Sequence, residues 1–287
     1  MRTGSFKGFE TRISDPGILW IRFNRPAQKN GMTSVMKRDL IETLTEAQMD
    51  NAVRVIVFTG SGDSFSAGDN LKGYAALDRD GEGNHMPLIP GGHDTGIGTY
   101  AALRTVSQAL NTKIREMDKI TIAAVNGICI QTGFSMALSC DFRIASTDAR
   151  LGSGTLRFAL LPDEGGQYLL VQHMGLSRTM DFLMRKKIVP AQEAMDLGLV
   201  SEVVAPDALM DAAEALAREM ADGPQVAMRL LKRTVYNAAE MTWQQALDDI
   251  AGKTAVVDHH PDAREGVASF KEKRRPEFNK WLDEQAG

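Results

Sequence analysis

The spacing of apolar and polar residues predicts a chain that begins by alternating strands with helices. Residues 17–26, "GILWIRFNRP", alternate as a strand does and end in an Asn-Arg-Pro turn. Residues 32–50 repeat apolar positions at the helical period, with Thr33 as the N-cap. Residues 53–68 form an apolar strand that runs into a Gly/Ser/Asp loop. Strand, helix and strand in this order predict a parallel crossover and an α/β fold.

The middle of the chain continues this alternation after one interruption. Residues 78–98 are rich in Gly, Asp and His and have no period, which is typical of a long functional or disordered loop. We expect a helix over residues 99–118, a buried strand over 120–130 that is broken by Asn-Gly, and a strand over 141–146. Residues 161–175 are expected to form a loop that enters a helix.

Helical periodicity dominates from about residue 190 onward. We therefore divide the chain into a core, residues 1–205, and a C-terminal α-helical region, residues 206–287. No internal repeat is visible in either part.

Composition narrows the class of protein. The chain is 43% hydrophobic and 24% charged with a net charge of −4, which is typical of a soluble globular protein and argues against nucleic acid as its main partner. Cys129 and Cys140 lie in apolar segments, so we expect reduced core thiols. Without a signal peptide or an apolar run of about 18 residues, we expect a cytoplasmic protein with no membrane partner. No metal-ligand spacing is present, so we expect no metal site.

Two glycine-containing segments could present backbone N–H groups. The loop at residues 59–72 follows a strand, and its small residues allow a tight turn that forms either a donor nest or an ordinary turn. Gly133 precedes a short helix whose first N–H groups could bind negative charge. The same segment weakly matches a nucleophile elbow, with Ser135 as nucleophile and a later histidine as base (His173, His259 or His260).

Two charged segments could act on a substrate. Asp163 and Glu164, in "LPDEGG", stand near an expected helix start, where acids either cap the helix or serve as general acid and base. Residues 269–280 flank Phe270 with basic residues, which suits either phosphate binding with base stacking or a solvated helix end.

The order of five motifs resembles the crotonase superfamily, the enoyl-CoA hydratase/isomerase family. These motifs are "NRPAQKNGM", "FSAGDNLK", "AAVNGICIQTGFSMALSCDFRIAS", "LPDEGG" and "GVASFKEKRRPEF". The resemblance covers about residues 17–280 and implies a crotonase-like spiral of ββα units with a C-terminal helical trimerisation region. It also implies a homotrimer or a dimer of trimers that acts on an acyl-CoA thioester, with coenzyme A as part of the substrate and no separate cofactor.

The resemblance also assigns site residues. It places an oxyanion hole on the backbone N–H groups of Asp69 and Thr132, where two fixed donors would stabilise the charge that develops on a thioester oxygen. It places the loop at residues 78–98 beside the acyl pocket. The implied CoA-binding residues are Lys29, Ala67, Lys72, Phe270 and Lys273, of which the last two often serve a neighbouring subunit.

The resemblance fails at the two glutamates that hydratases of this family carry. Their positions are occupied by Ser135 and Thr155, which we expect in the pocket and which cannot move a proton unaided near neutral pH. Several isomerase branches place their carboxylate at the position of Asp163. The sequence therefore predicts an enoyl-CoA isomerase that shifts a proton and a double bond with Asp163, and Glu164 is the second candidate.

Three other functions stay open. Asp163 could act as a nucleophile or water-orienting base in hydrolysis, although the aromatic partner of such enzymes is replaced by Thr155. Glu164 or a loop histidine could support an atypical hydration or lyase reaction. The chain could also be a catalytically degenerate homologue that only binds CoA esters.

Overall fold

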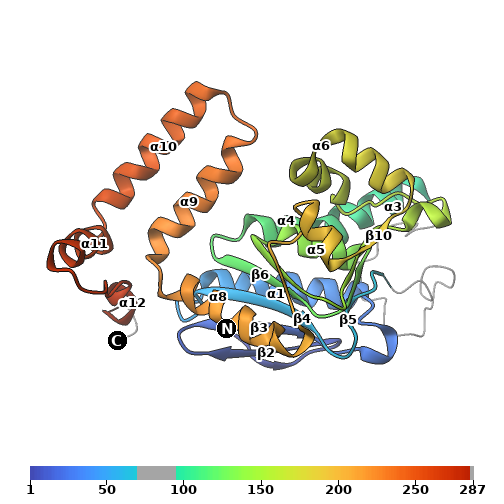
Figure 1. The fold of residues 1–287 in the computed structure, drawn as a ribbon, viewed down its shortest axis with the longest axis horizontal. Coiled ribbons are helices and arrows are strands. Elements are labelled where there is room, and N and C mark those ends of the chain that lie inside the picture. The colour runs from blue at the N-terminus through green and yellow to red at the C-terminus, as the bar shows by residue number, and fades with distance from the viewer. Residues whose placement is uncertain (70–94, 285–287) are drawn as a thin grey trace.

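The computed structural model describes residues 1–69 and 95–284 and is built around a seven-stranded sheet (Figure 1). The sheet order is β1-β2-β3-β4-β6-β8-β11, antiparallel from β1 to β3 and parallel from β3 to β11. The strands are β1 (Gly4–Ser5), β2 (Phe9–Ser14), β3 (Ile18–Phe23), β4 (Val55–Gly60), β6 (Ile120–Val125), β8 (Phe142–Ser146) and β11 (Glu202–Val204). The expected strands are confirmed within a few residues, and so is the α/β class.

A second, four-stranded sheet lies beside the first and has the order β10-β9-β7-β5. Its strands are β5 (Ser64–Ser66), β7 (Ile128–Ile130), β9 (Arg150–Gly152) and β10 (Ile188–Pro190). Each of β4, β6 and β8 is followed within a few residues by a short strand of this second sheet, so the chain repeatedly steps from one sheet to the other. Three-residue strands are too short to show a period, which is why the sequence did not separate them.

The helices on one side of the main sheet complete the core. They are α1 (Ser34–Met49), α3 (Gly96–Ala102), α4 (Gln108–Glu116), α5 (Thr132–Ser139), α6 (Gly166–Met184) and α7 (Ala191–Asp196). The Thr33 side chain accepts a hydrogen bond from the Met36 N–H at 3.2 Å, as expected of the N-cap of α1. α3 and α4 join through the π-helical turn η3 (Leu103–Ser107), and this helix begins three residues earlier than expected because Thr95 caps it.

The opposite face of the sheet is covered by α8 (Leu209–Asp222). Leu209 and three alanines of α8 are buried in a cluster with alternate residues of β3, β4, β6 and β8. Small side chains let a helix approach a sheet closely, so α8 packs with the core although it lies within residues 206–287. Cys129 and Cys140 are buried unpaired thiols, as the sequence predicts.

The remaining helices extend away from the sheets (Figure 1). They are α9 (Gln225–Ala238), α10 (Trp243–Asp258), α11 (Pro261–Glu272) and α12 (Lys280–Glu284). Lys232 and Tyr236 of α9 anchor them through hydrogen bonds of 2.8 and 2.7 Å to the Asp141 carboxylate. Across residues 1–69 and 95–284, every helix falls short of the length and apolar character that crossing a membrane requires.

Candidate functional site

A cavity of about 200 Å³ opens where the end of β5, the start of α5 and the segment before α6 meet. Six of the residues singled out from the sequence line it, together with an apolar wall that includes Ile130, Phe158, Leu160 and Leu161. Those six are Ala67, Asp69, Thr132, Thr155, Asp163 and Glu164. The fold therefore brings residues from three distant motifs to one site.

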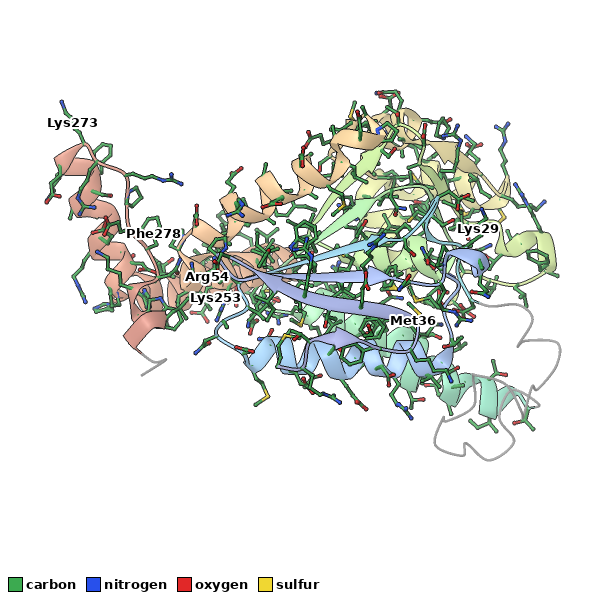
Figure 2. All side chains as sticks on the ribbon, turned by 90° about the horizontal axis from the view of Figure 1, so that it is seen from below. Lys29, Met36, Arg54, Lys253, Lys273 and Phe278 are labelled. Atoms are coloured by element: carbon green, nitrogen blue, oxygen red, sulfur yellow. The ribbon has the colours of Figure 1, made fainter. Side chains whose placement is uncertain are left out.

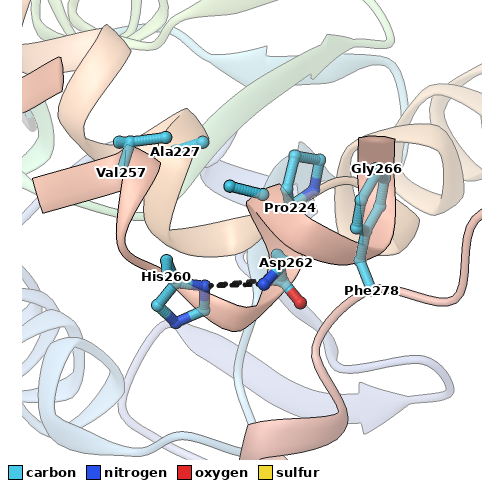
Figure 3. Close-up of a pocket in the computed structure, with 8 residues that line it drawn as sticks. Pro224, Ala227, Val257, His260, Asp262, Gly266 and Phe278 are labelled. Atoms are coloured by element: carbon cyan, nitrogen blue, oxygen red, sulfur yellow. Dashed lines mark hydrogen bonds and ion pairs between the residues drawn. The ribbon is translucent and has the colours of Figure 1, made fainter. Parts of the chain in front are cut away.

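A second cavity, of about 220 Å³, lies among the C-terminal helices (Figure 3). Its wall is largely apolar, and its polar contact is a 3.2 Å hydrogen bond from the Asp262 N–H to Nδ1 of His260. Neither of the candidate carboxylic acids lines this cavity, so the first cavity is the candidate active site.

The turn after β3 positions the segment that follows β5. The Ala67 N–H donates to the Lys29 carbonyl at 2.9 Å, and the Met32 N–H donates to the Gly68 carbonyl at 2.8 Å. The buried Asn30 amide donates to the carbonyls of Ser61 and Ser64 and fixes the loop between β4 and β5. These bonds hold Asp69 beside the first turn of α5.

The first turn of α5 approaches β5 closely because residue 133 is glycine. A Cβ atom there would lie 2.5 Å from the Ser66 carbonyl oxygen. Gln131, just before the helix, adopts φ 54° and ψ −124°, a conformation that favours glycine. Thr132 is the first residue of α5, so its N–H has no acceptor within the helix.

A buried lysine joins the parts of the site. Lys37 of α1 is 3% exposed, and its Nζ lies 2.7 Å from Asp69 Oδ1, 2.7 Å from Ser107 Oγ and 3.3 Å from Glu164 Oε1. Burial acts to lower the pKa of Lys37, but the charges of Asp69 and Glu164 outweigh it, and the pKa is raised above its ordinary value. Lys37 is therefore an ammonium ion at neutral pH.

Glu164 is the most deeply buried acid of the site, with a side chain 5% exposed. Thr132 Oγ1 lies 2.5 Å from its Oε1 and 2.8 Å from Asp69 Oδ1. Burial raises the pKa of Glu164 to about 7; Asp69 and Asp163 add to the rise, and Lys37 opposes it. This carboxyl group therefore carries a proton for much of the time at neutral pH.

Asp163 is half-buried and lines the same cavity. Its backbone carbonyl accepts a 2.9 Å hydrogen bond from Gln108, and the Glu164 carbonyl accepts one of 3.1 Å from Asn111. The N-cap of α6 is Gly165, which makes no side-chain hydrogen bond to the helix. Neither acid is therefore the N-cap residue of α6.

The remaining pocket candidates are placed differently. Ser135 is buried one turn inside α5, close to Gly166, and it is not part of the cavity wall. Thr155 is in the wall, with its Oγ1 3.0 Å from Ser153 Oγ. No histidine in the described ranges lines the cavity, and burial lowers the pKa of His173 to about 4. This arrangement does not support the serine-nucleophile alternative.

The expected CoA-binding residues do not converge within one chain. Figure 2 shows Lys29 and Lys273 at opposite ends of the molecule. Lys29 is exposed and paired with Asp63, whereas Phe270 and Lys273 are exposed at the end of α11. Lys72 and most of the loop at residues 78–98 lie outside the described residues. Among residues 1–69 and 95–284, no group of three or more His, Cys, Asp or Glu residues is arranged to hold a metal ion.

Sequence reasoning missed Lys37 and Ser107. Lys37 lies among the apolar residues of α1 that face the core, including Met36 and Leu40. A lysine on the apolar face of a helix is rarely buried without a partner. That position was the available signal, and the partner could not be identified before the fold was known.

Comparisons with known proteins find similarity over nearly the whole chain. The family model described as enoyl-CoA hydratase/isomerase matches residues 14–86 and 91–281. The chain is 29% identical over 267 residues to 1,2-epoxyphenylacetyl-CoA isomerase from Escherichia coli (strain K12), covering 92% of this chain and 95% of the relative. It is 28% identical over 261 residues to 2,3-dehydroadipyl-CoA hydratase from the same strain, covering 91% and 94%. The solved structure of an enoyl-CoA hydratase from Bacillus anthracis matches with a TM-score of 0.85 at 28% identity, over 95% of this chain and 99% of that one.

Proposed function

Because this chain belongs to the enoyl-CoA hydratase/isomerase family and has its crotonase fold, we propose that it moves a double bond along the acyl chain of a CoA thioester, with Asp163 as the base. The observation that carries the proposal is the position of Asp163, which lines the same cavity as Asp69 and Thr132. Ser135 and Thr155 occupy the positions of the two hydratase glutamates, which favours isomerisation over ordinary hydration.

The backbone N–H groups of Asp69 and Thr132 form the oxyanion hole in this proposal. Loss of a proton from the carbon next to the thioester places negative charge on the carbonyl oxygen. Two fixed donors stabilise that charge without having to reorganise, and each contributes about 3 kcal/mol in comparable sites. The N–H of Thr132, which begins α5, also benefits from the positive end of the helix dipole.

The carboxylate of Asp163 acts as the base. It takes a proton from C2 of a 3-enoyl-CoA, and the electrons of the broken C–H bond form a dienolate. Addition of a proton at C4 then gives the conjugated 2-enoyl-CoA. The chemistry uses no cofactor, since coenzyme A is part of the substrate.

Binding of the CoA moiety involves two chains in this proposal. Lys29, Ala67 and Lys72 serve the site of their own chain, and Phe270 and Lys273 reach the nucleotide of a neighbouring subunit. The extended helices α9–α11 support this arrangement because they expose large apolar side chains that a trimer or dimer of trimers would cover. These side chains include Leu231, Val235, Trp243, Val256, Val267 and Phe270.

Isomerisation of a 3-enoyl-CoA, followed by the absorbance of the conjugated thioester, tests the proposal. Asp163→Asn should lower kcat by roughly 10²- to 10⁴-fold, because the base is lost while CoA binding remains. The matched control is Asp148→Asn, a change at an exposed surface aspartate, which should leave kcat unchanged. An Asp163→Asn enzyme that isomerises at the rate of the control would refute the role of Asp163.

Hydration of a 2-enoyl-CoA is the second candidate reaction. The position of Glu164 in the same cavity as Asp163 favours it. A second carboxyl group in the same cavity, with a pKa of about 7, could protonate the acyl chain while Asp163 activates water. Mass spectrometry of the product distinguishes the two reactions, because hydration adds one water and isomerisation adds none.

A further inference from the structure

The hydroxyl group of Thr132 lies between two carboxyl groups. Its Oγ1 is 2.8 Å from Asp69 Oδ1 and 2.5 Å from Glu164 Oε1. A hydroxyl has one hydrogen, so it can donate to only one of these oxygens. At the other contact the carboxyl group must supply the hydrogen, because otherwise two sets of lone pairs would face each other. The geometry therefore favours protonation of one of the two carboxyl groups.

The surroundings select Glu164 as the protonated group. Lys37 Nζ lies 2.7 and 2.9 Å from the two oxygens of Asp69 but 3.3 Å from the nearer oxygen of Glu164. The Asp69 side chain is also 37% exposed, against 5% for Glu164. Both the ammonium group and water therefore stabilise a charge on Asp69 better than on Glu164. In this arrangement the Glu164 carboxyl group donates to the Thr132 hydroxyl, and that hydroxyl donates to the ionised Asp69. The Lys37 ammonium group pairs with the Asp69 charge.

We propose that Glu164, buried and hydrogen-bonded to Thr132 while Lys37 pairs more closely with Asp69, is a second catalytic acid, so that Asp163 removes the proton from C2 while Glu164 delivers a different proton to C4. This inference rests on the proposed isomerisation. The described contacts of the Glu164 carboxyl group are made by Oε1, and Glu164 is one of the residues that line the cavity. Lys37 acts as a positioning residue, since its contacts are with the acids.

The cycle transfers two different protons. The Asp163 carboxylate gains the C2 proton, and the C–H electron pair forms the dienolate. Rotation of the Glu164 carboxyl group turns its O–H toward the cavity, that bond breaks, and C4 gains the proton. The Thr132 hydroxyl then donates to the Glu164 carboxylate that remains. Asp163 loses a proton to solvent and Glu164 gains one, which restores the starting state.

Isotope labelling separates this mechanism from one that uses a single acid. A 3-enoyl-CoA is converted in D₂O, and deuterium at C4 of the product is measured at low conversion. With two acids, C4 receives hydrogen from solvent, and the hydrogen removed from C2 does not appear there. With one acid that does not exchange its proton with solvent between the two steps, the C2 hydrogen is carried to C4. Absence of any conversion would instead reject the proposed isomerisation, so the two failures are distinguishable.

Glu164→Gln is the matched variant, because its amide has the shape of the protonated acid but no proton to give. We expect its isomerisation rate to fall by roughly 10²-fold or more, while Asp148→Asn stays at the wild-type rate. The inference is overturned if the Glu164→Gln enzyme stays within tenfold of wild type, or if wild-type enzyme carries the C2 hydrogen to C4.

Infrared difference spectroscopy tests the protonation itself without substrate. At about pH 6, wild-type protein should show a carboxylic-acid carbonyl band that Glu164→Gln lacks, and the band should disappear by about pH 8. If wild type and variant show no difference in this region at about pH 6, Glu164 is ionised and the inference is wrong.

Discussion

Replacing Glu164 by Gln should change how the stability of the folded chain depends on pH. Burial raises the pKa of Glu164 from 4.5 to about 7, so between these values the folded chain holds a proton that the unfolded chain has lost. Stability therefore falls as the pH rises through this window. The contribution is fully present below about pH 4.5 and is lost above about pH 7.

The size of this stability change follows from the difference between the two pKa values of Glu164. Each pH unit between the two pKa values changes the free energy of unfolding by about 1.4 kcal/mol, so Glu164 accounts for a loss of about 3 kcal/mol. The side chain is almost fully buried, so solvent screening does not reduce this figure much. Lys37 does not alter the window, because its raised pKa affects stability only under alkaline conditions.

Urea unfolding measures the effect, with tryptophan fluorescence as the signal and equal protein concentrations throughout. Wild type and Glu164→Gln are compared at several pH values from about 4.5 to about 8. Relative to wild type, the variant should gain about 3 kcal/mol across this range. The other acids are common to both proteins, so their contributions cancel in the difference. A difference that changes by less than about 1 kcal/mol would refute the buried, protonated state of Glu164.

Other consequences can be measured more simply. Gly133→Ala should lower the free energy of unfolding by roughly 1–3 kcal/mol, because the new Cβ would lie 2.5 Å from the Ser66 carbonyl oxygen; an unchanged melting temperature would contradict this contact. Asp141→Asn should cost roughly 3–5 kcal/mol in denaturant unfolding, because it leaves the Lys232 ammonium buried without its carboxylate; a loss below about 1 kcal/mol would be inconsistent with that ion pair. Sedimentation of the full chain should give a trimer or hexamer, and a monomer at micromolar concentration would reject the proposed assembly.

The sequence predicted the main strands and helices well because they are long enough to show a period. The strand of residues 120–130 illustrates the limit, since it is really β6 and the three-residue β7 on two different sheets. α8 is a second example. It was grouped with the C-terminal helices by its period, but its alanine face packs on the sheet, which only the partner surface reveals.

The candidate site was predictable residue by residue but not as a network. Motif order indicated that Asp69, Thr132 and Glu164 belong to one site, and all three line the same cavity. Their mutual hydrogen bonds join residues 32 and 63 positions apart along the chain, and the bond from Lys37 to Glu164 joins residues 127 positions apart. No local pattern encodes such separations. Lys37 and Ser107 were missed for this reason.

Two hydrogen bonds link α4 to the backbone of Asp163 and Glu164. They affect how the substrate specificity of this enzyme could change in evolution. Gln108 and Asn111 are one helical turn apart, and each holds the carbonyl of one acidic residue. These bonds fix the segment before α6 to a helix, so it is held more rigidly than an unsupported loop. Substitutions in the apolar wall of the cavity could therefore change which acyl group is accepted while both acids keep their positions. A substitution at either amide would remove the hydrogen bond that holds one of the two acids.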